Sequence, residues 1–570
     1  MRVARDDGWM PIDCASVEAR LAALAPDQRA AATAPPGPVL CVAPAGSGKT
    51  TTLVTRVAWL VANGAAPESI TAITFNRRAA EELGSRIGPA VGVDTTIRVR
   101  TFHALGREIL AEAGVAVERL VDRGTIVRSL FPEASPARLR RYDDAFSRLK
   151  LDLRVRPAEI EVDPEAGPIA RAFVAYEAAL AESGSLDFDD LVARALETLE
   201  ADPALLDRWR GRCAHLLVDE AQDVDRSQLG LACLLAAPAN RIFLVGDDDQ
   251  SIYGWRLADV RRILDLGGLL PGLRRIDLET NYRCPAPVVE RAVTLVTRNE
   301  ERFAKRIRAR PNATGHLVLA ADDGDNVSRL GRVAEGWPDD DSSIAVLART
   351  NRELLPALVL ALDREVPFQA TRLVSPLEDR RLDGLLEEAG RLDRRLPLLV
   401  RLARAGATLE EEDRSTAADD DDQAAEAGEP PLPASDLVAA VVGWAIPFRD
   451  LESFVVAVRA RRDLLRTLRR DDARLTLATV HSTKGLEFDH VTVIGMDAVR
   501  FPSARSIADA PDPVRQLQEE RRLAYVAWTR ARRSLTLSYD PATPSGFLLE
   551  AFSPEELGLP MAPPPSERAP

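Results

Sequence analysis

The segment APAGSGKT (Ala43–Thr50) decides the fold class of this 570-residue chain. It follows the apolar run VLCV and precedes TTLVTRVAWLV, whose apolar spacing is typical of a helix. A strand, a glycine-containing loop and a helix in this order predict a phosphate-binding loop, although Ala43 stands where the first glycine is usual. Gly46 and Gly48 allow backbone N–H groups to close around phosphate oxygens.

Carboxylates gather at the end of a second apolar run, LLVDEAQDVD (Leu216–Asp225). Carboxylates repel one another and are costly to desolvate, so we expect a cation beside them. Within a phosphate-loop fold, Asp219 and the Thr50 hydroxyl are predicted to hold Mg²⁺. Lys49 is predicted to reach the β- and γ-phosphates of ATP, and Glu220 to orient and deprotonate the attacking water.

A third strand end lies in FLVGDDDQSIYGWR (Phe243–Arg256). Gln250 is an uncharged donor and acceptor, which suits it to sensing a γ-phosphate. Tyr253 and Trp255 are two of the few aromatic residues in a chain that is 5% aromatic. On a loop beyond a strand they either stack on nucleic-acid bases or form a local hydrophobic cluster.

Four charged residues near these motifs have two interpretations each. Asp223 and Asp225 either cap the next helix or contribute to the site. Arg283, in LETNYRCP, and Arg530, in VAWTRARR, either stabilise charge on a transferring phosphoryl group or lie on the surface, as most arginines do.

Composition limits the class of protein. The chain is 46% apolar and 28% charged, and its length predicts roughly three to four domains. The five cysteines are scattered without a CxxC pair, which argues against structural zinc and predicts a reducing, cytoplasmic setting. We see neither a signal peptide nor a membrane-spanning run. The net charge of −14 argues against binding nucleic acid by bulk charge. Any binding of nucleic acid therefore requires a local basic or aromatic groove.

Lysine is rare in this chain. Of 74 basic residues only four are lysine, and arginine is the usual cation. Lysine persists where a compact point charge is required. Lys49 and Lys484 fall inside motifs, whereas Lys150 and Lys305 carry no assignment and are attributed to chance.

The fold class predicted is α/β, because apolar strands followed by polar turns and helices recur and indicate parallel sheets. The pattern fades between Val99 and Arg210, where amphipathic helices dominate, and returns after about residue 315. Two α/β bodies with helical insertions are expected. The predicted limits are 1–95 and 206–274 for the first body, 96–205 for its insertion, 275–380 and 472–555 for the second body, 381–471 for a reduced insertion with an acidic tether at 410–433, and 556–570 for a proline-rich tail.

The motifs, taken in order, resemble those of superfamily 1 DNA helicases of the UvrD/Rep/PcrA family, over about Ala25 to Tyr539. The segments that carry the resemblance include APDQRAA, TFNRRAAEEL, VRTFHALGREIL, SLDFDDLV, LETNYRCP, IAVLARTN, TLATVHSTKGLEFDHV and MDAVRFP. The resemblance implies two RecA-like P-loop motor domains. It also implies that Arg530 acts as an arginine finger and that Arg283 meets the γ-phosphate.

Two sets of site residues follow from the motifs and the resemblance together. The residues expected to bind ATP are Gln28, Ala43, Pro44, Ala45, Gly46, Ser47, Gly48, Lys49, Thr50, Thr51, Tyr282, Arg283, Glu487 and Arg530. Those expected to contact DNA are Phe75, His103, Tyr253, Trp255, Arg256, Arg349, His481 and Phe501.

The function predicted is an ATP-dependent, Mg²⁺-requiring 3′–5′ DNA helicase or translocase in DNA repair or replication, acting on single-stranded and 3′-tailed duplex DNA. One alternative is a translocase that strips proteins from single strands. Another is a DNA-binding scaffold with a weak ATPase that needs a partner. Three departures from the family stand out: Thr51 replaces a frequent arginine, the span from Arg349 to His481 is short, and the chain ends soon after RSLTLSYD.

Overall fold

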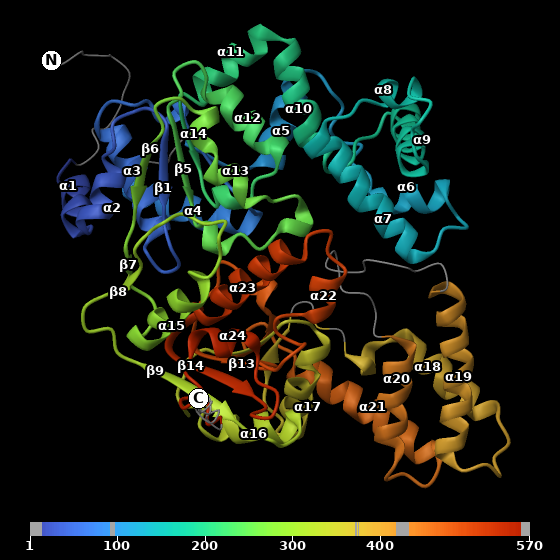
Figure 1. The fold of residues 1–570 in the computed structure, drawn as a ribbon. Coiled ribbons are helices and arrows are strands. Elements are labelled where there is room, and N and C mark those ends of the chain that lie inside the picture. Colours follow the sequence, from blue (N-terminus) through green and yellow to red (C-terminus); the bar gives the residue numbers. More distant parts are fainter. Residues whose placement is uncertain (1–13, 92–96, 371–372, 374, 418–432, 560–570) are drawn as a thin grey trace, which may run out of the picture. The chain divides into compact units, whose positions relative to one another are not determined.

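The computed structural model describes residues 14–91, 97–370, 373, 375–417 and 433–559. They fall into two compact units (Figure 1). The first comprises residues up to 134, 139–282 and 301–308, and the second contains 135–138, 283–300 and the residues from 309 onward. No helix in these described ranges is long and apolar enough to cross a membrane.

The first unit is built on six parallel strands in the order β3-β2-β4-β5-β1-β6. They are β1 (Val39–Val42), β2 (Ile70–Thr74), β3 (Arg98–Thr101), β4 (His215–Val218), β5 (Ile242–Gly246) and β6 (Arg274–Asp277). Successive side chains of a strand point to opposite faces. Leu40 and Val42 therefore lie in one apolar core and Val39 and Cys41 in another, so the sheet is covered on both faces.

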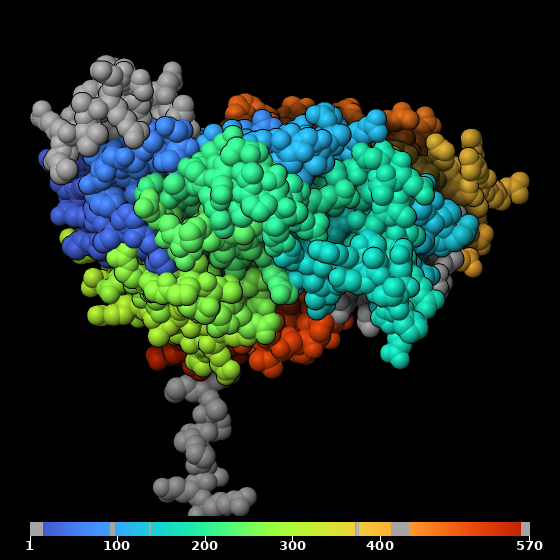
Figure 2. Space-filling view, turned by 90° about the horizontal axis from the view of Figure 1, so that it is seen from above, coloured from blue at the N-terminus to red at the C-terminus, as the bar shows by residue number. Residues whose placement is uncertain are grey.

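Helices from distant parts of the sequence cover these two faces. One face carries α1 (Cys14–Ala23), α2 (Pro26–Ala32), α3 (Lys49–Ala62) and α4 (Arg77–Val91). The other carries α5 (Phe102–Glu112), α10 (Asp190–Ala201), α11 (Pro203–Arg212), α12 (Arg226–Ala236), α13 (Val260–Leu264) and α14 (Leu266–Leu269). In Figure 2 the blue N-terminal segment and the green segment after residue 200 adjoin on one face, as the pairing of β1 with β5 and β6 requires.

A smaller helical group interrupts this unit. It contains α6 (Arg123–Leu130), α7 (Pro136–Ser147), α8 (Pro157–Glu161) and α9 (Pro168–Ser183). Its own apolar core includes Phe146, Phe173 and Tyr176. The predicted insertion at 96–205 is therefore too wide, because β3, α5 and α10 belong to the motor core. The predicted end of the first body at 274 is likewise too early, since β6 completes the sheet.

The second unit has a second parallel sheet, ordered β11-β12-β10-β13-β14-β9. Its strands are β9 (His316–Ala321), β10 (Ile344–Ala348), β11 (Phe368–Gln369), β12 (Leu475–Thr479), β13 (Phe488–Val493) and β14 (Ala531–Tyr539). Its helices are α15 (Ala286–Val296), α16 (Asn326–Glu335), α17 (Leu355–Asp363), α22 (Ala504–Ala508), α23 (Pro513–Trp528) and α24 (Gly546–Ala551). Mixed α/β architecture with two parallel sheets confirms the predicted fold class: two RecA-like bodies with helical insertions.

The second insertion is a four-helix group that shares a core with this sheet. Its helices are α18 (Arg380–Arg391), α19 (Leu398–Ala417), α20 (Ala434–Ala445) and α21 (Leu451–Leu468). One continuous apolar cluster runs from Val346 on the sheet through Leu358 on α17 to Leu437 and Phe454 in the insertion. This group is therefore fused to the second motor body by shared packing.

Two segments predicted to lack regular structure begin within folded elements. Helix α19 continues to Ala417, so the tether cannot begin at 410, and the rest of it (418–432) lies outside the described residues. At the tail, Leu557 is buried and Glu556 pairs with Arg291 at 2.6 Å. The predicted tail residues 560–570 also lie outside the described ranges.

Candidate nucleotide site and nucleic-acid interface

The loop between β1 and α3 has the backbone that phosphate binding requires. Gly46 and Gly48 adopt φ values of +68° and +83°, which favour glycine. Gln28, on α2, donates from Nε2 to the Ser47 carbonyl at 2.8 Å. A Cβ at Gly48 would lie 2.6 Å from that same Nε2, so a larger residue would displace the Gln28 side chain and also strain the φ of +83°. The structure thus gives Gln28 a loop-holding contact, and its predicted contact with the base remains a prediction.

The segment before Arg283 clamps the same loop from the other side. The Asn281 side chain donates to the Ala45 carbonyl at 2.8 Å, and the Tyr282 amide donates to the Gly46 carbonyl at 2.8 Å. The Tyr282 side chain is 39% exposed beside the loop, as stacking on a base would require. Asn281 was missed by sequence reasoning, although it lies within LETNYRCP.

Lys49 and Glu220 form an ion pair at the centre of the site. The Lys49 ammonium lies 3.1 Å from each carboxylate oxygen of Glu220. Burial lowers the pKa of Lys49, but the carboxylates of Glu220, Asp219 and Asp247 outweigh it and raise the pKa above its usual value. Lys49 is therefore protonated, and a terminal phosphate would compete with Glu220 for its charge.

Thr50 and Asp219 have the donor atoms that Mg²⁺ prefers. A hydroxyl and a carboxylate are hard oxygen ligands, and they come from the first turn of α3 and from the end of β4. Across the described residues, no group of three or more His, Cys, Asp or Glu side chains is arranged to hold a metal by itself. These two residues therefore fit a Mg²⁺ ion that takes its remaining ligands from phosphate and water.

A hydrogen-bonded chain connects Glu220 to the third strand end. Gln222 donates to Glu220 Oε2 at 2.6 Å and accepts from the Asp247 amide at 3.0 Å. Asp247 in turn accepts from Gln250 Nε2 at 2.7 Å. The residue predicted to activate water and the residue predicted to sense the γ-phosphate are thus joined through two side chains. Gln222, the glutamine of DEAQD, was not singled out from the sequence.

Asp225, which had two interpretations, is a helix cap. Its carboxylate accepts from the Gln228 amide at 2.8 Å at the start of α12. Burial raises the pKa of Asp225 to about 7, which the amide hydrogen bonds oppose. Its role is therefore structural. Asp223 accepts from Gln222 at 3.1 Å and so lies beside the Glu220 network.

Aromatic rings from two loops stack on the first unit. Phe75, after β2, lies 4.9 Å from Tyr253 with ring planes 9° apart. Tyr253 meets Trp255 edge-on at 6.1 Å, and the Arg256 guanidinium lies 4.6 Å from the Trp255 ring. Each of the three rings is half-buried. The three rings therefore form one cluster that retains exposed surface, and their stacking on bases stays a prediction.

A second stacked pair contains a residue that sequence reasoning missed. His103, at the start of α5, stacks on Phe188 at 3.9 Å, and Phe188 is 55% exposed. Burial, with a smaller contribution from the charge of Arg256, lowers the pKa of His103 to about 4 against the opposing charge of Asp189. The ring is therefore neutral near pH 7. The sequence feature that could have identified Phe188 is an aromatic residue flanked by aspartates in SLDFDDL.

The aspartates of SLDFDDL have a structural role. The buried Lys150 ammonium contacts Glu177 at 2.7 Å and Asp187 and Asp190 at 2.9 Å each. An ammonium has three donors, and here each meets a carboxylate. Removing one partner of a buried ion pair costs about 3–5 kcal/mol. Attributing Lys150 to chance was therefore wrong.

In the second unit, three predicted nucleotide residues from distant parts of the sequence come together. Arg283 pairs with Glu487 and donates to the Thr529 carbonyl at 3.1 Å. Arg530 donates to the Leu486 carbonyl at 3.0 Å, beside Glu487. The carboxylate of Glu487 is shared with a further arginine, Arg532. The Arg530 side chain is itself buried, 2% exposed, so a phosphate reaches its guanidinium only after a local rearrangement. The predicted ribose contact of Glu487 and the phosphate contacts of the two arginines remain predictions.

Two residues predicted to contact DNA do not have the exposure this requires. Arg349 pairs with Glu520 at 2.6 Å, and their side chains are only 5% and 1% exposed. Phe501 is fully buried and packs edge-on against Phe547 at 6.0 Å. A buried ring cannot stack on a base, and a guanidinium held by a buried carboxylate has no surface for a phosphate. Both predictions are wrong for this structure. His481 lies half-buried near Arg349, and its DNA contact stays a prediction.

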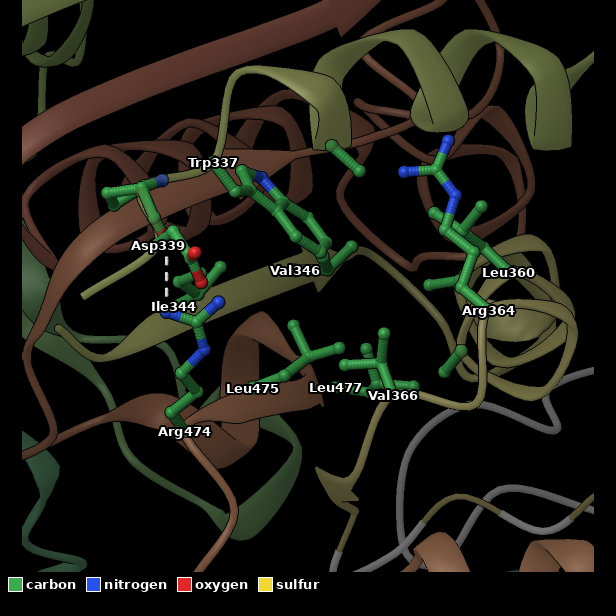
Figure 3. A pocket seen from close by; sticks show the side chains of 14 residues that line it. Trp337, Asp339, Ile344, Val346, Leu360, Arg364, Val366, Arg474, Leu475 and Leu477 are labelled. Carbon is green, nitrogen blue, oxygen red and sulfur yellow. Dashed lines mark hydrogen bonds between the residues drawn. The ribbon is translucent and has the colours of Figure 1, made fainter. Parts of the chain in front are cut away.

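A cavity of about 270 Å³ lies elsewhere, in the second unit (Figure 3). Apolar side chains of α16, α17, β10 and β12 line it, together with Trp337, and Arg364 and Arg474 stand at its edge. None of the predicted site residues belongs to its lining. The candidate nucleotide site is therefore separate from this cavity.

The phosphate loop, the acidic end of β4 and a second parallel sheet define the class: a P-loop motor with two RecA-like bodies. Comparison with known proteins agrees. Residues 24–268 match the model of the UvrD/REP helicase N-terminal domain, and residues 394–541 match that of the UvrD-like helicase C-terminal domain.

Several known proteins are similar to this chain over most of its length. DNA helicase II of Escherichia coli K12 is 30% identical over 612 residues, covering 90% of this chain and 84% of that protein. ATP-dependent DNA helicase UvrD1 of Mycobacterium bovis is 28% identical, covering 90% and 82%. ATP-dependent DNA helicase PcrA of Staphylococcus aureus Mu50 is 25% identical, covering 88% and 81%. The chain therefore belongs to the UvrD/Rep/PcrA family and is an ATP-dependent DNA helicase.

Proposed function

We propose that this helicase steps 3′ to 5′ along single-stranded DNA and separates the strands of a 3′-tailed duplex ahead of it. The direction is taken from the family, and one observation supports the coupling of hydrolysis to stepping. Gln250 and Tyr253 lie three residues apart on the loop after β5, and Gln250 is tied through Asp247 and Gln222 to Glu220. A change at the terminal phosphate would therefore move the loop that carries a base-stacking ring.

The first unit supplies the chemistry in this proposal. Lys49 holds the β- and γ-phosphates, Glu220 orients and deprotonates the attacking water, and Gln250 contacts the γ-phosphate. Thr50 and Asp219 hold Mg²⁺, which neutralises phosphate charge when bound. Glu220 is released from Lys49 as the phosphate takes its place, and the freed carboxylate then becomes available to water.

The remaining nucleotide contacts are proposed from the family. Gln28 and Tyr282 bind the base, Glu487 binds the ribose, and Arg283 and Arg530 stabilise charge on the transferring phosphoryl group. The loop contacts of Gln28 and Tyr282 and the convergence of Arg283, Glu487 and Arg530 support this assignment. The protein is proposed to act in DNA repair or replication in the cytoplasm, which family membership alone supports.

The direction and the outcome of stepping are tested with tailed substrates. We expect ATP-dependent separation of a duplex with a 3′ single-stranded tail and none with a 5′ tail, measured on a native gel. We also expect the moving protein to displace streptavidin from a biotin at the strand end toward which it steps. Separation of only the 5′-tailed duplex would overturn the direction. Displacement of streptavidin without strand separation would instead favour a translocase that strips proteins.

Phe188 provides a test of the strand path. Stacking of one base on an aromatic ring contributes about 1–3 kcal/mol, so Phe188→Ala should weaken binding of a fluorescent oligothymidylate by about 5- to 150-fold in anisotropy titrations. The matched control is Val162→Ala, an apolar residue of the preceding α6–α9 group that is 81% exposed. Equal affinities for the Phe188→Ala and control proteins would remove Phe188 from the path.

A further inference from the structure

One short segment of the chain belongs to the first unit although its neighbours on both sides belong to the second. Residues 301–308, here called the strap, lie between 283–300 and the residues from 309 onward. The Arg308 amide donates to the Glu279 carbonyl at 2.9 Å, and the Arg275 guanidinium lies 4.4 Å from the Phe303 ring. The strap is thus fixed on the first unit at its middle and at its end.

Lys305 is the centre of the strap's attachment. Its ammonium lies 2.8 Å from Asp247 and 2.9 Å from Asp249, and it also pairs with Asp248. All four side chains are fully buried. Three donors on one nitrogen meet three carboxylates, a geometry that suits a compact ammonium better than a planar guanidinium. This explains why lysine persists here, so attributing Lys305 to chance was wrong.

The strap provides further partners for these carboxylates. Arg302 forms a two-pronged pair with Asp249 at 3.0 and 2.8 Å, and the Phe303 amide donates to Asp248 at 2.8 Å. Buried carboxylates are costly without such partners. Each aspartate of GDDDQ therefore depends on the strap.

The Asp247 carboxylate contacts both the strap and Gln250. One carboxylate oxygen accepts from Lys305, and the other accepts from Gln250 Nε2 at 2.7 Å. The Asp247 amide donates to Gln222, which donates to Glu220. Lys305 is therefore connected to Gln250 through the Asp247 carboxylate, and to Glu220 through the backbone amide of the same residue and Gln222.

We propose that Lys305 is a positioning residue for ATP hydrolysis. By fixing the Asp247 carboxylate it aims the Gln250 amide at the γ-phosphate, so it acts through Gln250 and not on the nucleotide. The inference rests on the proposed role of Gln250.

The test is a double-mutant cycle of Lys305→Met and Gln250→Ala. Each protein is assayed for kcat with saturating oligothymidylate and for its relative affinity for AMP-PNP and ADP, by competition with a fluorescent nucleotide. We expect each single variant to lose about tenfold in kcat and in preference for AMP-PNP over ADP. The double variant should match Gln250→Ala alone, because one residue acts through the other.

A matched control separates positioning from simple stabilisation. Lys150→Met removes a buried ammonium that also meets three carboxylates, but in the insertion. It should lower the melting temperature as Lys305→Met does while leaving the DNA-free preference for AMP-PNP over ADP unchanged. If Lys305→Met does not fold, Lys305→Arg keeps the charge without the three-way geometry, and the same cycle applies with smaller losses.

The outcomes distinguish the two claims. Losses that multiply in the double variant, or an equal loss of preference in Lys150→Met, would overturn the positioning role while leaving the role of Gln250 intact. A Gln250→Ala protein with normal kcat and preference would overturn the proposed role of Gln250, and the inference about Lys305 with it.

Discussion

Glu220→Gln is expected to lower DNA-stimulated ATP hydrolysis by at least about 100-fold, because removal of a general base costs roughly 10²–10⁴-fold. The amide keeps the shape of the side chain and can accept a hydrogen bond from Gln222, but it cannot take a proton from water. Steady-state phosphate release with saturating oligonucleotide measures the effect. The melting temperature of the variant should change little.

The same substitution should strengthen the binding of ATP. In the structure the Glu220 carboxylate forms an ion pair with the Lys49 ammonium at 3.1 Å. A phosphate that binds Lys49 must displace this carboxylate. Loss of that negative charge removes a repulsion worth about 1 kcal/mol in a solvated site, a gain of roughly fivefold in affinity. Asp225→Asn, five residues further on, is the control, because asparagine caps a helix as well as aspartate. Near-normal hydrolysis by the Glu220→Gln protein would count heavily against the mechanism.

Lys49→Ala should abolish hydrolysis by a different route. Its ammonium is the positive charge that reaches from the phosphate loop to Glu220, and loss of one preorganised donor to developing charge costs about 10²–10³-fold in kcat. Unlike Glu220→Gln, this variant should also bind ATP more weakly, since the negative charges of Asp219 and Glu220 remain uncompensated. Equilibrium binding of a fluorescent ATP analogue, measured beside phosphate release, separates the two variants.

The control for Lys49→Ala is Arg86→Ala, a half-exposed cation that pairs with Glu82 on α4 of the same unit. Its hydrolysis and binding should equal those of the unchanged protein. Lys49→Arg should recover little, because a planar guanidinium does not replace a compact ammonium at a phosphate. Tight ATP binding by the Lys49→Ala protein would show that another group holds the terminal phosphates.

The strand-end chemistry could be predicted because it is local in sequence. In the phosphate loop, the acidic end of β4 and the loop after β5, residues a few positions apart are fixed by one strand and one turn. Lys49, Glu220 and Gln250 therefore lie where the motifs indicate, and so do the stacked rings of Phe75 and Tyr253. The α/β class followed for the same reason, since apolar runs with turns between them predict parallel sheets.

The limits of the bodies could not be predicted to the same extent. Strand β3 and helix α5 have the composition of the helical region that follows them, and only their packing against the sheet shows that they belong to the motor core. Helix α19 runs into an acidic segment that resembles a linker by composition. Composition averages over a segment, whereas a boundary depends on which side chains are buried by others far along the chain.

By itself, then, the sequence determined the two-sheet class and the family, and it predicted the nucleotide-binding residues, because each depends on short motifs. Only the tertiary structure decided which charged and aromatic residues are free to act. It paired Arg349 with Glu520 and buried Phe501, exposed Phe188 on His103, and enclosed Lys150 and Lys305 among three carboxylates each. Burial and charge pairing depend on residues that are brought together only by folding, and no local pattern records them.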